Sequence, residues 1–142
     1  MSILIYAEYA EGKFKKAAFE LASYAKKVAE SLGTTVTAVT INAGDVSELS
    51  KYGVDKVLKV NNDELSGFTA KAYADVIKQA AQKENIKLLL LSSTTDSVYL
   101  SSLVAVALEA GYASNVVGLP VSTSPFQVKR TAFSNKAFMI LK

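Results

Sequence analysis

Short apolar runs alternate with longer amphipathic stretches along most of the chain, and this alternation restricts the fold more than any other sequence feature. Ser2–Tyr9 holds a near-continuous apolar run, which is typical of a strand buried in a parallel sheet. Between Lys13 and Leu32 the apolar residues recur every three or four positions with charged residues between them, which predicts an amphipathic helix. Gly33 follows as the expected end of that helix.

The alternation continues as far as Pro120. Thr34–Ile41 is rich in β-branched residues and Ile86–Leu91 is the most apolar run, so both predict buried strands. Strands that alternate with helices predict a parallel sheet with right-handed crossovers. We expect the first strand and Ile86–Leu91 to be neighbours near the sheet centre, with helices on both faces. The other predicted strands are Asp55–Val60 and Ala113–Leu119, and the other predicted helices are Asp45–Tyr52, Thr69–Glu84 and Ser97–Ala110.

After Pro120 the pattern changes to short strands. Phe126–Phe133 and Lys136–Leu141 predict a β-hairpin with Ser134 and Asn135 at its turn. The chain of 142 residues has the usual length of one domain. We therefore predict a single α/β domain that is Rossmann-like, with a doubly wound, mostly parallel sheet of about five strands and a C-terminal hairpin. The helix before the last parallel strand is expected to end at Gly111 and to bury Leu100, Leu103, Val104, Ala107 and Leu108.

Composition excludes several classes of function. The chain has no cysteine and no histidine, which removes disulfides, the usual zinc and iron–sulfur ligands, and the commonest general base. Its lysines are scattered along predicted helices, whereas a nucleic-acid surface favours a basic stripe with arginine and aromatic residues. We expect no nucleic-acid binding. No apolar run approaches the roughly 20 residues of a membrane span, and the start lacks the features of a signal peptide, so we expect a cytoplasmic protein.

Ligands of doubly wound sheets bind beyond the carboxyl ends of the strands, at the topological switch point. The loops in that position are Ala7–Gly12, Asn42–Val46 and Ser92–Ser97. The first loop has only Gly12 where a dinucleotide fingerprint needs three glycines, and the chain has no Gly-Lys-Ser/Thr phosphate loop. The motifs therefore give no support to nucleotide binding.

One of these loops is rich in hydroxyl groups and is the candidate ligand site. Its hydroxyls and amides face a predicted helix start and are suited to hold an anion. The same residue types also cap helices by accepting hydrogen bonds from free N–H groups, and a carboxylate at Asp96 would repel an anion. Capping is the favoured interpretation. The residues are Ser92, Ser93, Thr94, Thr95 and Asp96.

Other candidates for chemistry have simpler interpretations. Glu8 and Asp45 are a possible acid and base at the end of the sheet, but nothing in the sequence brings them together, so solvated loop carboxylates are favoured. Several tyrosines suit stacking on a flavin or adenine ring, yet their spacing agrees with half-buried faces of helices and strands. No catalytic or metal-binding residue is evident. The tyrosines considered are Tyr6, Tyr9, Tyr24, Tyr73, Tyr99 and Tyr112.

Three parts of the sequence carry a family resemblance: Ile3–Glu8 followed by Gly12–Lys16, then Tyr52–Val57, then Lys129–Thr131 together with Ser134–Ala137. The first is similar to the opening of electron transfer flavoprotein α subunits. The second resembles the YGADKV element of that family, and the third resembles its RPVYAGKA segment. The resemblance covers the whole chain, and the order and spacing of these elements are more specific than any one of them.

The chain departs from the family pattern after the fourth predicted strand. Where the family has a Gly-Arg-Asp turn and then Ala-Pro-Arg, this chain has Ser97-Val98-Tyr99 and Ser101-Ser102-Leu103. Contacts that those arginines make to anions elsewhere in the family are therefore not expected here. The flavin-binding elements of the family lie in its carboxy-terminal domain, to which no residue of this chain corresponds.

The resemblance implies a scaffold domain, residues 1–142, of an α subunit that holds FAD in a separate domain absent from this chain. It implies a β subunit partner, which holds AMP, and electron transfer from flavin dehydrogenases, such as acyl-CoA dehydrogenases, to a membrane quinone reductase. An alternative is a stand-alone adenine-nucleotide-binding α/β module resembling universal-stress-like proteins, which the missing glycine-rich loop disfavours. A hydrolase or transferase that uses Ser93, Thr94 or Asp96 ranks last, because no base partner is evident.

Overall fold

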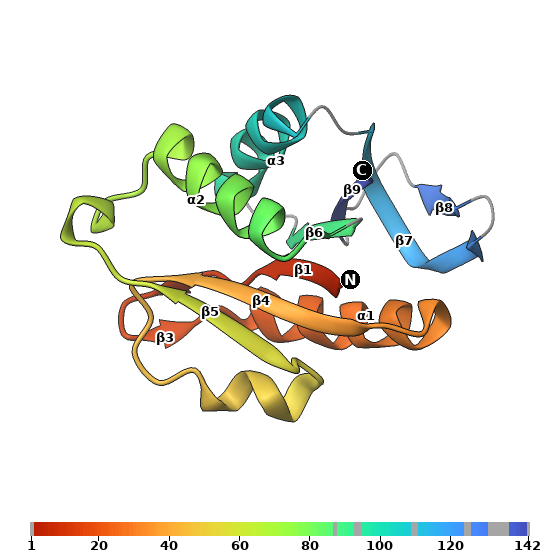
Figure 1. The fold of residues 1–142 in the computed structure, drawn as a ribbon, viewed down its shortest axis with the longest axis horizontal. Coiled ribbons are helices and arrows are strands. Elements are labelled where there is room, and N and C mark those ends of the chain that lie inside the picture. The colour runs from red at the N-terminus through yellow and green to blue at the C-terminus, as the bar shows by residue number, and fades with distance from the viewer. Residues whose placement is uncertain are drawn as a thin grey trace.

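A computed structural model describes residues 2–86, 88–92, 95–108, 111–123, 126–130 and 137–141. Within these ranges seven strands form one sheet in the order β5-β4-β1-β6-β9-β7-β8, with helices on both faces (Figure 1). A separate ribbon pairs the short strands β2 and β3. The bounds are β1 (Ser2–Tyr6), β2 (Tyr9–Ala10), β3 (Lys13–Phe14), α1 (Lys16–Leu32), β4 (Thr35–Ile41), β5 (Lys56–Val60), α2 (Ala70–Lys83), β6 (Leu88–Ser92), α3 (Thr95–Ala107), β7 (Gly111–Thr123), β8 (Phe126–Arg130) and β9 (Ala137–Leu141), with short 3₁₀ helices η1 (Ser47–Tyr52) and η2 (Asp63–Leu65).

The parallel half of the sheet confirms the predicted doubly wound arrangement. Strand β1 lies between β4 and β6 and pairs with both in parallel, and β4 pairs in parallel with β5. The first strand and the most apolar strand are therefore neighbours at the centre, as the sequence predicts. The chain runs from β1 to β4 and β5 and then returns to the other side of β1, which is the strand order that creates a switch point.

Alternate residues of each central strand pack on opposite faces. Ile3 and Ile5 of β1 face α1, whereas Leu4 faces α2 and α3. Leu89 and Leu90 of β6 divide between the faces in the same way, and both are fully buried. Burying a leucine or isoleucine side chain contributes about 1.5–3 kcal/mol, so strands that are apolar on both faces belong at the centre of the sheet.

Glycines end the first helices at the predicted positions. Gly33 adopts a left-handed φ of 65° after α1, and its N–H donates to the carbonyl of Glu30. Gly53 has a φ of 96° after η1, and a Cβ there would lie 2.6 Å from Cγ of Lys26. Gly53 is thus required both by its backbone conformation and by the close approach of α1.

The predicted C-terminal hairpin is wrong in its pairing. Strand β8 pairs with β7, not with β9, and β9 lies between β6 and β7 with antiparallel neighbours on both sides. The predicted turn at Ser134 and Asn135 lies outside the described residues. The sheet therefore extends beyond the predicted five strands. Because β9 is antiparallel to both neighbours, β7 runs in the same direction as β6. Local sequence pattern favours a hairpin between consecutive strands, whereas the observed insertion is a non-local pairing.

Helix α3 also differs from its prediction. It begins at Thr95 and ends at Ala107, and Gly111 begins β7. Leu100, Val104 and Leu108 are buried as predicted, but Leu103 is 41% exposed. Apolar residues surround this helix on most sides, so spacing alone does not identify its buried face. The predicted burial of Ala107 lies outside the side chains that the structure describes.

Candidate functional site

A cavity of about 630 Å³ opens at the carboxyl edge of the parallel strands. Residues 9–12 line it after β1, residues 41–44 line it at the end of β4, and the segment 61–66 contributes after β5. Tyr73 of α2 also lines it. Its size lies within the range of small-molecule pockets, and it lies at the carboxyl edge of the sheet on the side of β1, β4 and β5, whereas the switch point lies between β1 and β6. This cavity is the candidate functional site.

Aromatic side chains form the walls of the cavity. The Tyr9 ring packs edge-on against Phe14, with ring centroids 5.0 Å apart. The Tyr9 hydroxyl lies 3.1 Å from the point where Gly44 would carry a Cβ, so this tyrosine has room because Gly44 has no side chain. Across the cavity the Tyr73 hydroxyl donates a hydrogen bond of 2.7 Å to the carbonyl of Leu65. Both tyrosines are therefore held in place by their surroundings.

Asn42 joins the loops that follow β4 and β5. Its φ is 53°, a left-handed conformation that asparagine tolerates better than most residues. Its Nδ2 donates to the carbonyl of Asn62 at 2.9 Å, and its Oδ1 accepts from the Asn62 N–H at 2.7 Å. The backbone N–H of Asn42 also donates to the carbonyl of Val60 at 2.7 Å. These bonds fix the two loops relative to each other and to the end of β5.

Polar groups around the cavity retain hydrogen-bonding capacity. Within the described part of the chain, no intramolecular partner is present for the side chains of Glu11, Asn61, Asp63 and Ser66 or for the Tyr9 hydroxyl. Glu11 and Asp63 supply carboxylates, and none of the described lining residues is a lysine or arginine. The site therefore contains hydrogen-bond acceptors, hydroxyl groups and aromatic side chains. Its described lining has no positively charged side chain that would pair with an anionic ligand.

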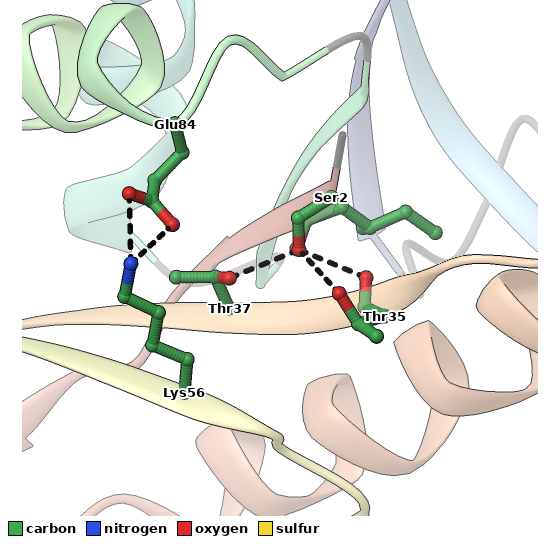
Figure 2. A network of polar contacts seen from close by, with 6 residues as sticks. Ser2, Thr35, Thr37, Lys56 and Glu84 are labelled. Carbon is green, nitrogen blue, oxygen red and sulfur yellow. Dashed lines mark hydrogen bonds and ion pairs between the residues drawn. The ribbon is translucent and has the colours of Figure 1, made fainter.

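The opposite, amino edge of the sheet uses its polar side chains internally (Figure 2). The Ser2 hydroxyl donates to the carbonyl of Thr35 and lies 2.9 Å from the Thr37 hydroxyl. Lys56 of β5 contacts the Glu84 carboxylate just after α2, with Nζ 3.0 Å from Oε1. Such groups stabilise the fold and are already paired, so this edge is not a candidate binding site.

Sequence reasoning located part of the cavity and missed part. The predicted loops Ala7–Gly12 and Asn42–Val46 meet there, but none of the described residues of Ser92–Ser97 lines it. The segment 61–66 was missed. It follows the third parallel strand and therefore lies at the same edge, and its Asp63 and Ser66 are the signal that would have identified it.

The hydroxyl-rich loop is only partly described. The Ser92 hydroxyl is buried and donates to the carbonyl of Ala17 at 3.2 Å, which ties β6 to α1. Ser93 and Thr94 lie outside the described residues. Thr95 and Asp96 belong to the first turn of α3, and their side chains lie outside those that the structure describes. Helix capping by this loop stays a prediction.

The proposed acid–base pair finds other partners. The Glu8 carboxylate is buried and lies 3.1 Å from Nζ of Lys15. Asp45 is at the surface, where its Oδ1 accepts from the Ser47 N–H at 2.9 Å. The Ser47 N–H and hydroxyl, followed by the charges of Lys59 and Lys51, lower the pKa of Asp45. Such a carboxyl stays ionised at neutral pH and is unsuited to act as a general acid.

The tyrosines have mixed roles. Tyr6 and Tyr73 are buried in the core and Tyr9 packs against it, as the core-and-interface interpretation predicts. Tyr9 and Tyr73 also line the cavity, which that interpretation did not foresee. The Tyr24 hydroxyl is buried with no hydrogen-bond partner in the described structure, and burial raises its pKa to about 12. The side chains of Tyr99 and Tyr112 lie outside those that the structure describes.

The family description "Electron transfer flavoprotein domain" matches residues 3–142. The chain belongs to the electron transfer flavoprotein family. It is 30% identical to the electron transfer flavoprotein subunit alpha of Thermoanaerobacterium thermosaccharolyticum over 99% of this chain and 44% of that protein. It is 29% identical to the protein FixB of Clostridium saccharobutylicum over 84% of this chain and 36% of that protein. An acryloyl-CoA reductase electron transfer subunit beta of Anaerotignum propionicum is 27% identical over 87% of this chain and 35% of that protein.

These matches confirm the resemblance inferred from the sequence and favour it over a stand-alone nucleotide-binding module. The chain spans less than half the length of these curated relatives. None of the helices in the described residues is long and apolar enough to cross a membrane. The same residues contain no group of acidic, histidine or cysteine side chains arranged to hold a metal ion.

Proposed function

We propose that this chain is the amino-terminal structural domain, residues 1–142, of an electron transfer flavoprotein α subunit. With a β subunit, it would carry electrons from flavin dehydrogenases, such as acyl-CoA dehydrogenases, to a quinone reductase in the membrane. The observation that carries this proposal is the match to a named α subunit over 99% of the chain. The name of one relative, an electron transfer subunit of acryloyl-CoA reductase, supports a link with acyl-CoA chemistry.

The contribution of this domain is structural and not catalytic. In the described part of the chain, the carboxylates and hydroxyls at the carboxyl edge are not arranged as a nucleophile with its base. Glu8, the buried carboxylate of this edge, is engaged by Lys15. A rigid sheet with helices on both faces supplies shape and contact surface, which is what a scaffold subunit domain requires.

FAD is held by another domain of the subunit. A flavin site needs close backbone approach to the pyrophosphate, commonly through glycines at a helix start, and groups that tune the ring. At the carboxyl edge Gly12 and Gly44 stand in separate loops, and the cavity between them is lined by the carboxylates of Glu11 and Asp63. Those carboxylates would repel a pyrophosphate. The lining therefore supports a flavin site outside residues 1–142.

The partner of this domain is a β subunit, and the AMP of the complex belongs to that subunit. The assembled complex works in the cytoplasm and meets the membrane through its quinone reductase. The family match supports the pairing, because the matched relatives carry names of electron transfer subunits.

The test uses the chain and the β-type subunit encoded in the same genome. Size-exclusion chromatography of the mixture should show a complex of the two, and a complex supplied with the flavin domain should transfer electrons from an acyl-CoA dehydrogenase to a dye. The chain alone should transfer none. Failure to form any complex, or dye reduction by the chain alone, would contradict the proposal.

A further inference from the structure

The proposed scaffold function does not account for the cavity at the carboxyl edge, because a domain that supplies only shape does not require a cavity. We propose that it binds a small ligand without a phosphate, a neutral or cationic heterocycle of about nucleoside size that carries hydroxyl or amino donors. The chemistry of the lining residues selects this class of ligand.

The cavity is built before any ligand enters. Asn42 fixes the loops after β4 and β5 through its paired hydrogen bonds to Asn62. Tyr73 is anchored by its bond to Leu65, and Tyr9 occupies the space that Gly44 leaves. Preorganised walls reduce the entropy that a ligand must lose on binding. A volume of about 630 Å³ accommodates a nucleoside with some water.

The walls suit a flat, partly apolar ligand. Ile41, Leu65 and Tyr73 line the cavity but are buried in the protein core, so they present only a small apolar surface. Tyr9 is half-buried, so part of its ring is accessible. Heterocyclic rings stack on such a ring, and the hydroxyl of Tyr9 has no partner among the described residues.

The charged groups exclude anions. Glu11 and Asp63 line the cavity, and the described lining contains no lysine or arginine. The ammonium group of Lys59 donates to the carbonyl of Gly44 at 2.8 Å, but Lys59 is not itself a lining residue. Carboxylates accept hydrogen bonds from hydroxyl and amino groups, and they repel phosphate. A ligand with donors and no negative charge therefore fits, and its phosphorylated form does not.

Adenosine and AMP form a matched pair of probes, since they differ by one phosphate. Amide chemical-shift titrations of the full chain should show saturable binding of adenosine, with shifts in segments 9–12, 41–44 and 61–66. AMP should bind at least about tenfold more weakly. The double substitution Glu11→Gln and Asp63→Asn should reduce that difference, because it removes both negative charges. The control Glu84→Gln removes one charge at the amino edge and should leave the preference unchanged.

Three results would overturn the proposal. The first is the absence of saturable shifts with adenosine up to about 5 mM. The second is tighter binding of AMP than of adenosine by the unmodified chain, which would mean that the cavity accepts anions. The third is a set of shifts confined to residues outside the three segments. Each result is independent of whether the chain pairs with a β subunit.

Discussion

The two edges of the parallel sheet are both rich in polar side chains but use them differently. At the amino edge the Ser2 hydroxyl hydrogen-bonds with Thr35 and with Thr37, and Lys56 pairs with Glu84. At the carboxyl edge the polar groups line a cavity and several have no partner among the described residues. The same kinds of residue therefore stabilise one edge and leave hydrogen-bonding capacity at the other. Substitutions at the amino edge should change stability, and those at the carboxyl edge should change binding.

The largest expected effect is at the entrance to β5 on the amino edge. Gly53→Ala should destabilise the fold by about 2–3 kcal/mol, because the residue has a φ of 96° and its new Cβ would lie 2.6 Å from Lys26. Gly12→Ala is a matched control at the carboxyl edge. Its φ is 79°, but no atom lies within 4 Å of the added Cβ, so about 1 kcal/mol is expected. Urea unfolding measures both, and equal losses would show that packing against α1 is unimportant.

Asn42 is an exception to the contrast between the two edges, because it lies at the carboxyl edge and its hydrogen bonds stabilise the loops there. Asn42→Ala removes the paired bonds to Asn62 and leaves alanine at a positive φ. We expect a loss of about 2 kcal/mol together with weaker binding of adenosine. Urea unfolding and the shift titration measure the two effects. A stability loss with unchanged binding would show that the loops do not need this link.

A smaller effect is expected at the buried hydroxyl pair. Thr37→Val keeps the shape of the side chain but removes its hydrogen bond to Ser2, which retains the carbonyl of Thr35 as acceptor. The expected loss is about 1 kcal/mol in thermal or urea unfolding, with no change in ligand binding. Altered binding would show that the two edges are coupled through the sheet.

The smallest effect concerns pH and the loop after β4. Because Ser47 lowers the pKa of Asp45 below its ordinary value of 3.8, the ionised carboxylate favours the folded state. This contribution is present above the ordinary pKa and is lost as pH falls through the lowered pKa. Asp45→Asn should therefore weaken the acid-induced loss of stability slightly. An NMR titration that places the pKa of Asp45 at or above its ordinary value would contradict this account.

The parallel half of the fold follows from local sequence pattern. The apolar runs around Ile3 and Leu89 predict buried central strands, and Gly33 and Gly53 mark helix ends, because each signal depends on neighbouring residues. The position of β9 between β6 and β7 depends on pairing with residues far away in the chain. Consecutive strands favour a hairpin on local grounds, so sequence pattern could not predict this insertion.

The sequence predicted where the candidate site lies, but it did not predict all of the residues that line it. The rule for doubly wound sheets places ligands at the carboxyl edge, and two of the three loops chosen on that basis meet at the cavity. The hydroxyl-rich loop drew attention by composition, whereas the segment containing Asp63 and Ser66 was overlooked. Composition identifies side chains that are able to bind a ligand. Only the strand order shows which of these side chains line the same cavity.

We propose above that this domain shapes an electron carrier whose flavin is bound in another domain. The most direct test is a fluorescence titration of FAD with the chain, followed by desalting and an absorbance spectrum. The account predicts unquenched flavin fluorescence up to about 100 μM protein and a colourless protein after desalting. Retention of yellow flavin, or quenching with a dissociation constant of about 1 μM, would contradict it.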